Sequence, residues 1–387
     1  MTTPAVAPLH ALLSHAFVAF TIELDNEFER QSPHRTARFG RTPGAGPRPW
    51  LTSFAMWTTA FRFIGPDGVS VRDLEGRSRL RTSLPGLERW GYVTVTPPAS
   101  APGARVPRSA WLVRTTPAGE AAKAAWERLV PVIEARWSER FGSEAIGRLR
   151  GSLARLVERL DPALPDGLPI VAFGFSTSLL PVRTPDGARA TDGADAAAGE
   201  DAAGATGVAE PRTTSDRPLW ALLARPLLAL ALEHEASSTL SLAMGADMLE
   251  HLEEVGLPVR ELPARCGISR EMVTVALSFL ERRGLATIEP GSTRLARLRP
   301  AGLAARDAYR RRVAAIEARW AEAYGREVLD DVRAALVEVV GLEAAPTPTV
   351  RLGLEPHPDG WRAKAPRLAV LPDFPLVTHR GGYPDGS

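Results

Sequence analysis

The second half of the chain carries apolar residues at helical spacing, three or four positions apart. This pattern predicts helices over residues 219–236 and 240–255. A shorter helix is expected over 259–265, with Leu262 and Ala264 directed toward the core. This part of the protein is therefore expected to begin as a group of packed helices.

The pattern changes from helical to alternating a few residues later. Ser269 is a favourable N-cap for a helix that runs to about Arg283, and Gly284 is a favourable residue to end it. Residues 285–288 and 294–299 alternate in polarity on either side of the turn "EPGST", as the strands of a hairpin do. Two helices joined by a tight turn and followed by a β-hairpin form a winged helix-turn-helix.

A repeated pentapeptide marks the next segment. Pro300 is expected to open a long helix to about Tyr324, followed by a helix to Val340. This long helix contains "IEARW" at 316–320, and the same letters stand at 133–137, 183 positions earlier. Upstream, "TPAG" matches "RPAG", "LERWGY" matches "LERRGL", and "GVSVRDL" matches "GLPVREL". The chain is therefore predicted to contain the same domain twice.

The start of the repeat and the linker complete the domain plan. "LHALL" near the N-terminus matches "LWALL", 210 positions later, and the first copy has extra residues mostly in the Pro/Gly/Arg-rich stretch "RQSPHRTARFGRTPGAGPRP". An acidic, Ala/Gly-rich linker separates the copies and is too poor in large apolar residues to fold. In the tail, "FPLV" is apolar enough to dock on the body. The predicted segments are the first domain, the linker, the second domain and the tail, over 1–183, 184–217, 218–345 and 346–387.

The order of elements, the "LERRGL" junction into the hairpin and the "TPAG/RPAG" helix start together resemble the multiple antibiotic resistance regulator (MarR) family. The resemblance implies a mainly α fold in which the first and last helices of two protomers intertwine, and each second helix of the motif enters a DNA major groove. Two copies in one chain can then pair as an intramolecular pseudo-dimer, so a monomer or a homodimer is expected. Trp137 and Trp320 of "IEARW" would face each other or pack in the core of their own copies. The implied function is transcription regulation through sequence-specific binding of double-stranded DNA.

The second copy supplies the clearest candidates for DNA contact. The N-terminal part of a recognition helix reaches base edges, while helix N-termini and wings reach phosphates. The candidates are Ser269, Arg270, Glu271, Thr274 and Ser278 on the helix and Arg294 in the hairpin. The residues expected to face the core are Val273, Ala276, Leu277 and Leu280. The family commonly has an Asp-Arg pair at the hairpin tip, where this chain has Thr293 followed by Arg294.

The first copy departs from this pattern. It is five residues shorter before "LER", and Pro85-Gly86 stand inside the stretch that corresponds to the recognition helix. Because a proline inside a helix costs about 3 kcal/mol, either this helix is broken or DNA is held through the arginines of "GRSRLR". The arginines expected as phosphate contacts are Arg77, Arg79 and Arg81, with Arg105 and Arg108 in the longer wing. An asymmetric pseudo-dimer suits an operator that is not a perfect palindrome.

The resemblance also raises the question of a small-molecule effector, which members of the family often hold between the DNA-binding part and the helical platform. The aromatic residues in a position to line such a cleft are Phe17, Trp50, Trp57 and Trp220, although aromatic residues at helical spacing commonly form plain core. Some relatives sense oxidants through cysteine. Cys266 stands in the turn of the motif, where a small buried residue is wanted, which favours a structural role.

Composition narrows the class of function further. The formal net charge is only +2, so any contact with an acidic polymer must come from local clusters of arginine. A single cysteine excludes an internal disulfide, and the seven histidines show no regular spacing for metal ligands, so neither a metal nor a cofactor is expected. The chain has no apolar stretch of membrane-spanning length and no basic signal segment at its start, and a cytoplasmic location is expected.

Two other classes of function share parts of this outline. Certain DNA glycosylases resemble this outline in fold, but their catalytic signature relies on paired glutamines, and this chain has one glutamine, Gln31. No nucleophile elbow, phosphate loop or dinucleotide fingerprint is present, so the protein is not expected to be an enzyme. The alternative is a winged-helix scaffold for protein–protein interaction, which the altered first copy supports best.

Overall fold

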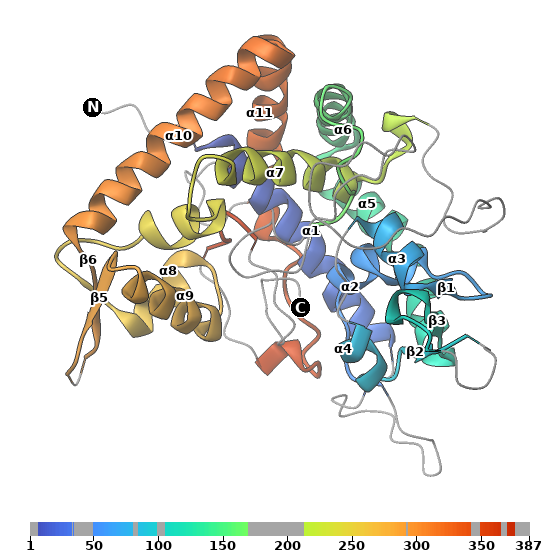
Figure 1. The fold of residues 1–387 in the computed structure, drawn as a ribbon. Helices are drawn as coiled ribbons and strands as arrows, with labels where there is room; N and C mark the ends of the chain where they lie inside the picture. The colour runs from blue at the N-terminus through green and yellow to red at the C-terminus, as the bar shows by residue number, and fades with distance from the viewer. Residues whose placement is uncertain are drawn as a thin grey trace.

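The computed structural model describes residues 7–32, 34, 49–79, 84–98, 105–168, 213–291, 293–341, 349–364 and 370–375. Within these ranges the chain is mainly helical, and its strands form two antiparallel sheets of three strands each (Figure 1). Of the helices described, none is both long and apolar enough to cross a membrane. The expectation of a mainly helical protein is confirmed.

The two halves of the chain have a similar succession of elements. The first half contains α1 (Leu9–Gln31), α2 (Phe54–Thr59), β1 (Val69–Ser70), α3 (Val71–Ser78), α4 (Leu84–Arg89), β2 (Val93–Thr96), β3 (Leu112–Thr115), α5 (Pro117–Phe141) and α6 (Ser143–Val157). The second half contains α7 (Leu219–Glu235), the π-helix η4 (Met244–Leu249), β4 (Leu257–Pro258), α8 (Leu262–Cys266), α9 (Arg270–Arg282), β5 (Ala286–Glu289), β6 (Leu295–Leu298), α10 (Pro300–Tyr324) and α11 (Arg326–Val340). The sheets have the equivalent strand orders β1-β3-β2 and β4-β6-β5. The sequence repeat is thus also a structural repeat.

Short 3-10 helices connect the longer elements. They are η1 (Phe61–Phe63), η2 (Arg108–Ala110), η3 (Thr214–Asp216), η5 (Val259–Glu261), η6 (Thr349–Arg351) and η7 (Arg362–Lys364). Of these, η3 falls inside the segment that we expected to be linker. The predicted linker over 184–217 otherwise lies outside the described residues up to position 212. Its last residues, 213–217, include η3 and lead directly into α7.

The glycine of "TPAG" and "RPAG" is required for the same structural reason in both copies. At Gly119 a Cβ would collide with the carbonyl oxygen of Tyr92, and at Gly302 with that of Leu285. Tyr92 and Leu285 are the equivalent residues of "LERWGY" and "LERRGL", just before the second strand of each sheet. The long helix can therefore pass this close to the sheet only because glycine lacks a side chain.

The prediction of an α-helix over 240–255 was wrong in both the type and the length of the helix. A π-helix, Met244–Leu249, takes its place and ends before the chain reaches the sheet. Gly245 packs so closely on the ring of Tyr309 that a Cβ would collide with it, and Asp247 is fully buried. These are long-range contacts with α10 and other parts of the fold, which apolar spacing within the segment does not encode.

The short helix before the turn also differs in one residue. Leu262 and Cys266 lie one turn apart on α8 and are both buried, at 0% and 1% exposed. Ala264 lies between them on the opposite face and is exposed, so the expectation that it points inward was wrong.

Helices from the two copies pack on each other along the centre of the molecule. The first helices of the copies, α1 and α7, are in contact, and so are the last helices, α6 and α11 (Figure 1). One continuous hydrophobic core includes buried residues of both copies, such as Phe20 on α1, Leu223 on α7 and Leu336 on α11. The two copies therefore share a core instead of forming separate bodies.

The tryptophan of each "IEARW" is buried within its own copy. The indole N–H of Trp137 donates to Glu23 on α1 at 3.0 Å, and that of Trp320 donates to Glu233 on α7 at 2.6 Å. The two glutamates are 210 positions apart, which is the spacing of the segments "LHALL" and "LWALL". The same hydrogen bond thus joins the long helix to the first helix in both copies. Of the two arrangements left open by the sequence, packing in the copy's own core is the one observed.

The glutamate of each "IEARW" reaches across to the other copy. Glu134 accepts the backbone N–H of Leu219, the first residue of α7, at 2.6 Å. Glu317 accepts the backbone N–H of Leu9, the first residue of α1, also at 2.6 Å. A carboxylate at a helix N-terminus satisfies a free backbone N–H and interacts favourably with the helix dipole. Each copy therefore caps the first helix of the other.

An arginine reinforces each of these caps. Arg150 on α6 pairs with Glu134 at 3.1 Å and donates to the carbonyl oxygen of Arg217 at 2.8 Å. Its equivalent, Arg333 on α11, pairs with the carboxylate of the second "IEARW" at 2.7 Å and donates to the carbonyl oxygen of Ala7. The caps are thus reciprocal: the contacts of Glu134 and Arg150 in one copy are repeated by Glu317 and Arg333 in the other, as in a two-fold symmetric dimer.

Candidate functional site

Helix α9 presents a polar face that starts at its N-terminus. Ser269 is the N-cap, and its hydroxyl oxygen accepts the backbone N–H of Met272 at 3.3 Å. The side chains of Arg270, Glu271 and Thr274 are exposed. The four residues expected in the core are all buried: Val273, Ala276, Leu277 and Leu280. The amphipathic pattern of the sequence therefore gave the correct orientation of this helix.

Two hydroxyl groups on this face are already engaged as donors. Thr274 donates to the carbonyl oxygen of Arg270, and the half-buried Ser278 donates to that of Thr274, both at 2.9 Å. They can still accept hydrogen bonds, which leaves Arg270 as the main donor of the face. Val275 lies beside them and is 43% exposed, and the sequence analysis did not single it out. An exposed valine there offers an apolar contact of the kind that reads a thymine methyl group.

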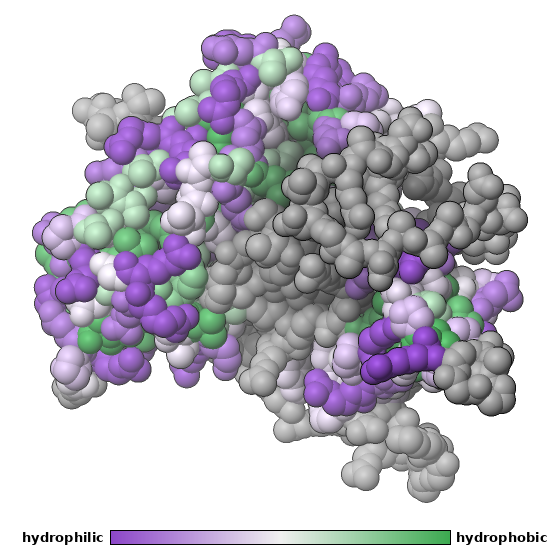
Figure 2. Space-filling model, viewed as in Figure 1, coloured by the Kyte–Doolittle hydropathy of each residue, from purple (hydrophilic) through white to green (hydrophobic). Residues whose placement is uncertain are grey.

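The hairpin after α9 carries Arg294 at its edge. Arg294 is exposed and precedes β6, and its carbonyl oxygen accepts the N–H of Val259 at 2.9 Å, which fixes its backbone. On the neighbouring strands Arg297 pairs with Glu289 at 2.9 Å, so its charge is neutralised within the hairpin. Figure 2 shows hydrophilic residues interspersed with apolar ones over this part of the surface. Arg270 and Arg294 form no ion pair with any described residue.

The corresponding helix of the first copy is short but not interrupted. Helix α4 runs from Leu84 to Arg89, and Pro85 lies in its first turn. A proline in the first turn costs little, because the N–H that it lacks would have no partner within the helix. Of the two alternatives left open by the sequence, a helix broken at Pro85-Gly86 is not seen in the described residues, where the helix continues through both positions. Within the part of the chain that the structure describes, this helix spans six residues, against 13 in α9, and offers a smaller surface.

The arginines proposed for the first copy are dispersed. Arg77 is exposed in the last turn of α3, and Arg79 follows it in the left-handed conformation with φ 59° and is half-buried. Arg81 lies outside the described residues. Arg105 and Arg108 are exposed before β3, and the guanidinium of Arg108 lies 5.3 Å from the centre of the Trp111 ring.

The aromatic residues considered for an effector cleft have different surroundings. Phe17, Trp57 and Trp220 are buried in helices, whereas Trp50 is 42% exposed and lies before α2, outside any helix. Trp57 of the first copy and Trp220 of the second meet with ring centres 5.7 Å apart, and Phe54 packs on both. The indole N–H groups of both tryptophans have no hydrogen-bond partner among the described residues. The structure thus brings two of the four residues together at the junction of the copies.

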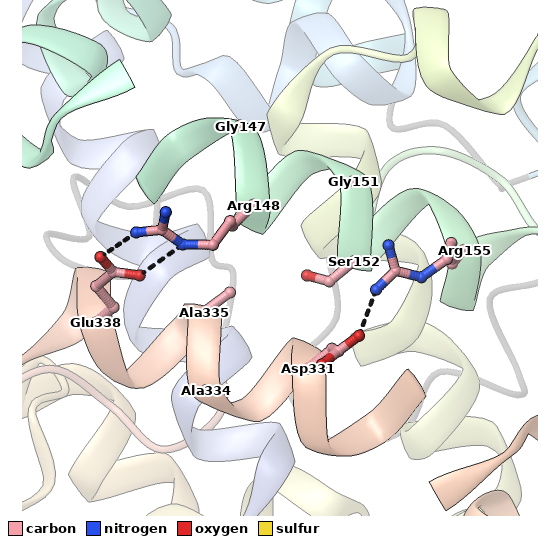
Figure 3. A pocket seen from close by; sticks show the side chains of 9 residues that line it. All are labelled: Gly147, Arg148, Gly151, Ser152, Arg155, Asp331, Ala334, Ala335 and Glu338. Atoms are coloured by element: carbon pink, nitrogen blue, oxygen red, sulfur yellow. Dashed lines mark hydrogen bonds and ion pairs between the residues drawn. The ribbon is translucent and has the colours of Figure 1, made fainter. Parts of the chain in front are cut away.

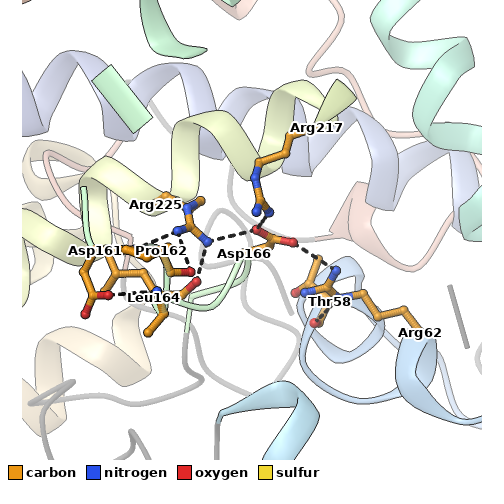
Figure 4. A network of polar contacts seen from close by, with 9 residues as sticks. Thr58, Arg62, Asp161, Pro162, Leu164, Asp166, Arg217 and Arg225 are labelled. Atoms are coloured by element: carbon orange, nitrogen blue, oxygen red, sulfur yellow. Dashed lines mark hydrogen bonds and ion pairs between the residues drawn. The ribbon is translucent and has the colours of Figure 1, made fainter. Parts of the chain in front are cut away.

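A network of arginines around Asp166 was not foreseen from the sequence (Figure 4). The carboxylate of Asp166 forms ion pairs with the guanidinium groups of Arg225 at 3.3 Å and Arg62 at 3.4 Å, and it also pairs with Arg217. Arg225 is buried within α7 and donates further to the carbonyl oxygens of Asp161, Pro162 and Leu164. Burial, followed by the charge of Arg217, lowers the pKa of the Arg225 guanidinium. The segment after α6 is in this way fixed onto the first helix of the other copy.

Several titratable side chains of the described residues are buried. Cys266 is 1% exposed, and burial raises the pKa of its thiol well above the usual range, which agrees with the structural role expected for it. His10 and His234 are buried on either side of Tyr309, and burial lowers the pKa of each to about 4. No group of three or more His, Cys, Asp or Glu side chains in the described ranges is placed to hold a metal ion.

A pocket of about 420 Å³ lies between α6 and α11 (Figure 3). Its floor consists of small residues, including Gly147, Gly151 and Ala335, and ion pairs close its two ends. Arg148 pairs with Glu338 and Arg155 pairs with Asp331, both at 2.6 Å. All four charged side chains are about half exposed, so the pocket is a feature of the helix–helix interface and not an enclosed binding site.

Comparison with known proteins gave no further assignment. No family model matches the chain, and no curated protein or solved structure matches it either.

Proposed function

We propose that the protein is a sequence-specific regulator of transcription that binds double-stranded DNA as a single-chain pseudo-dimer of two winged helix-turn-helix domains, resembling the MarR regulators. The observation that carries the proposal is the surface formed by α9 and the hairpin after it. An exposed, N-capped helix with Arg270 in its first turn lies beside a hairpin with the exposed Arg294, which forms no ion pair with a described residue. In winged helix-turn-helix proteins such a helix enters the major groove and contacts the bases, while the hairpin contacts the neighbouring phosphates.

The succession of elements supports this proposal in both copies. A short strand, two helices, and two further strands precede a long helix in each half of the chain. The strand orders β1-β3-β2 and β4-β6-β5 place the first short strand beside the last strand, as in a helix-turn-helix with a wing. The reciprocal caps made by the two "IEARW" glutamates support pairing of the copies in one chain.

The charges on α6 and α11 favour pairing within the chain over pairing of two identical chains through this face. Arg148 and Arg155 of the first copy stand where the second copy has Asp331 and Glu338, 183 positions later. The observed contacts join opposite charges across the interface. Two first copies, or two second copies, paired in the same way would place like charges together. A monomer in solution is therefore expected, and a measurement of its molecular mass tests this.

The DNA contact is tested by three arginine-to-alanine variants of the full chain. Duplexes are selected from a random library, and affinity for the best duplex is measured at several salt concentrations. Arg270→Ala is expected to weaken binding of the selected duplex by about 1–3 kcal/mol and to relax selectivity. Arg294→Ala is expected to weaken binding of all duplexes equally and to reduce the salt slope by about one unit. Arg282→Ala is the matched control, because this exposed arginine ends α9 far from its N-terminus.

The outcomes separate the regulator from its alternative. Weak binding, equal for all sequences and unaffected by Arg270→Ala and Arg294→Ala, would refute the proposal. That result would leave the protein-binding scaffold as the better explanation, for which the reduced α4 of the first copy is the supporting observation.

A further inference from the structure

The segment after α11 is attached to the first copy by a buried arginine. Arg362 is 2% exposed, and its guanidinium donates to the carbonyl oxygen of Asp25 on α1 at 2.7 Å. It also lies 3.8 Å from the carboxylate of Asp25 and 3.6 Å from that of Glu29. Asp25 accepts the backbone N–H of Phe54 at the start of α2, at 2.7 Å. This first anchor therefore joins the tail to two helices of the first copy.

A second anchor lies nearer the end of the chain. Asp373 contacts His15 on α1 at 3.1 Å and His251, which follows η4, at 3.6 Å. Although burial raises it, the pKa of the Asp373 carboxyl is held below its usual range by the hydrogen bonds from these two histidines. Asp373 thus bridges the first helix of one copy and the second copy.

The residues on either side of Asp373 are also bound. Ser14 on α1 donates to the carbonyl oxygen of Pro372 at 2.8 Å. The backbone N–H of Phe374 donates to the buried carboxyl group of Asp247 at 3.0 Å, and the Phe374 ring is fully buried. The docking of "FPLV" expected from the sequence is confirmed for its described residues, 374 and 375, which are buried.

The tail also lies directly against the turn between α8 and α9. Gly267 ends α8 in the left-handed conformation, with φ 68°. A Cβ at this position would be 2.7 Å from the carbonyl carbon of Leu371 and equally close to the nitrogen of Pro372. The backbone of the tail thus supports the turn that orients α9.

We propose that the C-terminal tail is a strap that holds the α8–α9 unit, defined as residues 257–298, in a fixed position against α1 and so fixes the separation of the two copies' DNA-binding elements. The consequence for DNA rests on the proposed function, whereas the strap itself rests on the contacts above. The first anchor holds the first copy, the second anchor also reaches the second copy, and both include a residue of α1. The second anchor and the close contact of Gly267 with the tail backbone restrain the position of the α8–α9 unit relative to α1.

Hydrogen exchange of the full-length protein tests the strap directly. Asp373→Asn keeps the size of the side chain but removes the charge that both histidines contact. Amides of residues 262–282 are expected to exchange roughly tenfold faster in this variant, since a charge-assisted contact that closes the unit is lost. Asp359→Asn, an exposed residue of the same tail, is the matched control and is expected to leave exchange unchanged. His251→Asn removes one partner of Asp373 without altering the tail. This variant replaces Asp373→Asn in the experiment if Asp373→Asn does not fold.

Duplexes in which the selected half-sites are separated by one or two additional base pairs test the consequence for DNA. The original protein is expected to discriminate against them, and Asp373→Asn is expected to lose most of that discrimination. Unchanged exchange of 262–282 in both Asp373→Asn and His251→Asn would overturn the strap, whatever the DNA result. Faster exchange in a protein that binds no duplex would sustain the strap and refute the proposed function.

Discussion

The reciprocal caps between the two copies predict that two substitutions far apart in the sequence have equal effects. Glu134→Gln and Glu317→Gln each keep the size of the side chain and remove its charge. Each carboxylate accepts a backbone N–H from the other copy at 2.6 Å and pairs with an arginine on the next helix, at 3.1 Å and 2.7 Å respectively. The two glutamates are also similarly buried, with side chains 25% and 22% exposed.

The expected loss follows from the two bonds that each charge makes. A hydrogen bond to a charged group contributes about 1.5–3 kcal/mol and a neutral one about 0.5–1.5 kcal/mol, so removing the charge weakens each bond by about 1 kcal/mol. The glutamine can still accept the backbone N–H, and solvent screens a side chain that is a quarter exposed. We therefore expect each variant to lower the free energy of unfolding by about 1.5 kcal/mol.

Urea unfolding of the full chain measures this loss as a shift of the midpoint at unchanged slope. Glu127→Gln, an exposed residue on the same helix as Glu134, is the control and should change stability by less than about 0.5 kcal/mol. Losses for Glu134→Gln and Glu317→Gln that differ by more than about 1 kcal/mol, or that do not exceed the control, would refute the reciprocal pairing of the copies.

Three further predictions follow from buried groups. Arg225→Met should lower the free energy of unfolding by about 3–5 kcal/mol in urea titrations, because three carbonyl oxygens lose this buried donor and Asp166 keeps only two of its three arginines, whereas the exposed Arg311→Met should have little effect. The pKa values of His10 and His234 are about 4 in the folded protein and about 6.5 in the unfolded chain. The contribution of each neutral histidine to the free energy of unfolding should therefore be fully present above pH 6.5 and fall by about 3 kcal/mol per histidine toward pH 4. His234→Leu should reduce that pH slope of the urea midpoint, and a flat profile in the original protein would contradict the assignment. Cys266 should react with a thiol-specific reagent only after denaturant is added, and rapid reaction of the native protein would show that the thiol is accessible.

Most of the helices and strands of the second copy could be predicted because their signals are local. The N-cap Ser269, the four buried residues of α9 and the strands of the hairpin all follow from caps, apolar spacing and turn residues within about 30 positions of each other. The helix expected over 240–255 failed because Gly245 and Asp247 are placed by contacts with distant residues. The effect of Pro85 could not be decided from the sequence, because it depends on where the helix begins, and in the described residues Pro85 lies in the first turn of α4.

The candidate site, too, could be predicted only in part from the sequence. The exposure of Arg270, Glu271 and Thr274 follows from the amphipathic pattern of one helix. The exposure of Val275 and the neutralisation of Arg297 by Glu289 required the packed hairpin and helix, since neither is visible in the periodicity. Asp166 and the arginines around it come from three separate segments, near positions 62, 166 and 217–225, and residues so far apart in the chain carry no local pattern.

The sequence by itself determined that this protein is mainly helical and that it contains the same unit twice, because periodicity, capping residues and self-similarity are written along the chain. Only the tertiary structure decided what the repeated "IEARW" does: its tryptophan binds a glutamate of the same copy, and its glutamate caps the first helix of the other. It also decided that the tail bridges the two copies through Asp373. These contacts join residues between 85 and 358 positions apart, and such pairs are selected by the packing of complete helices rather than by any local preference of the chain.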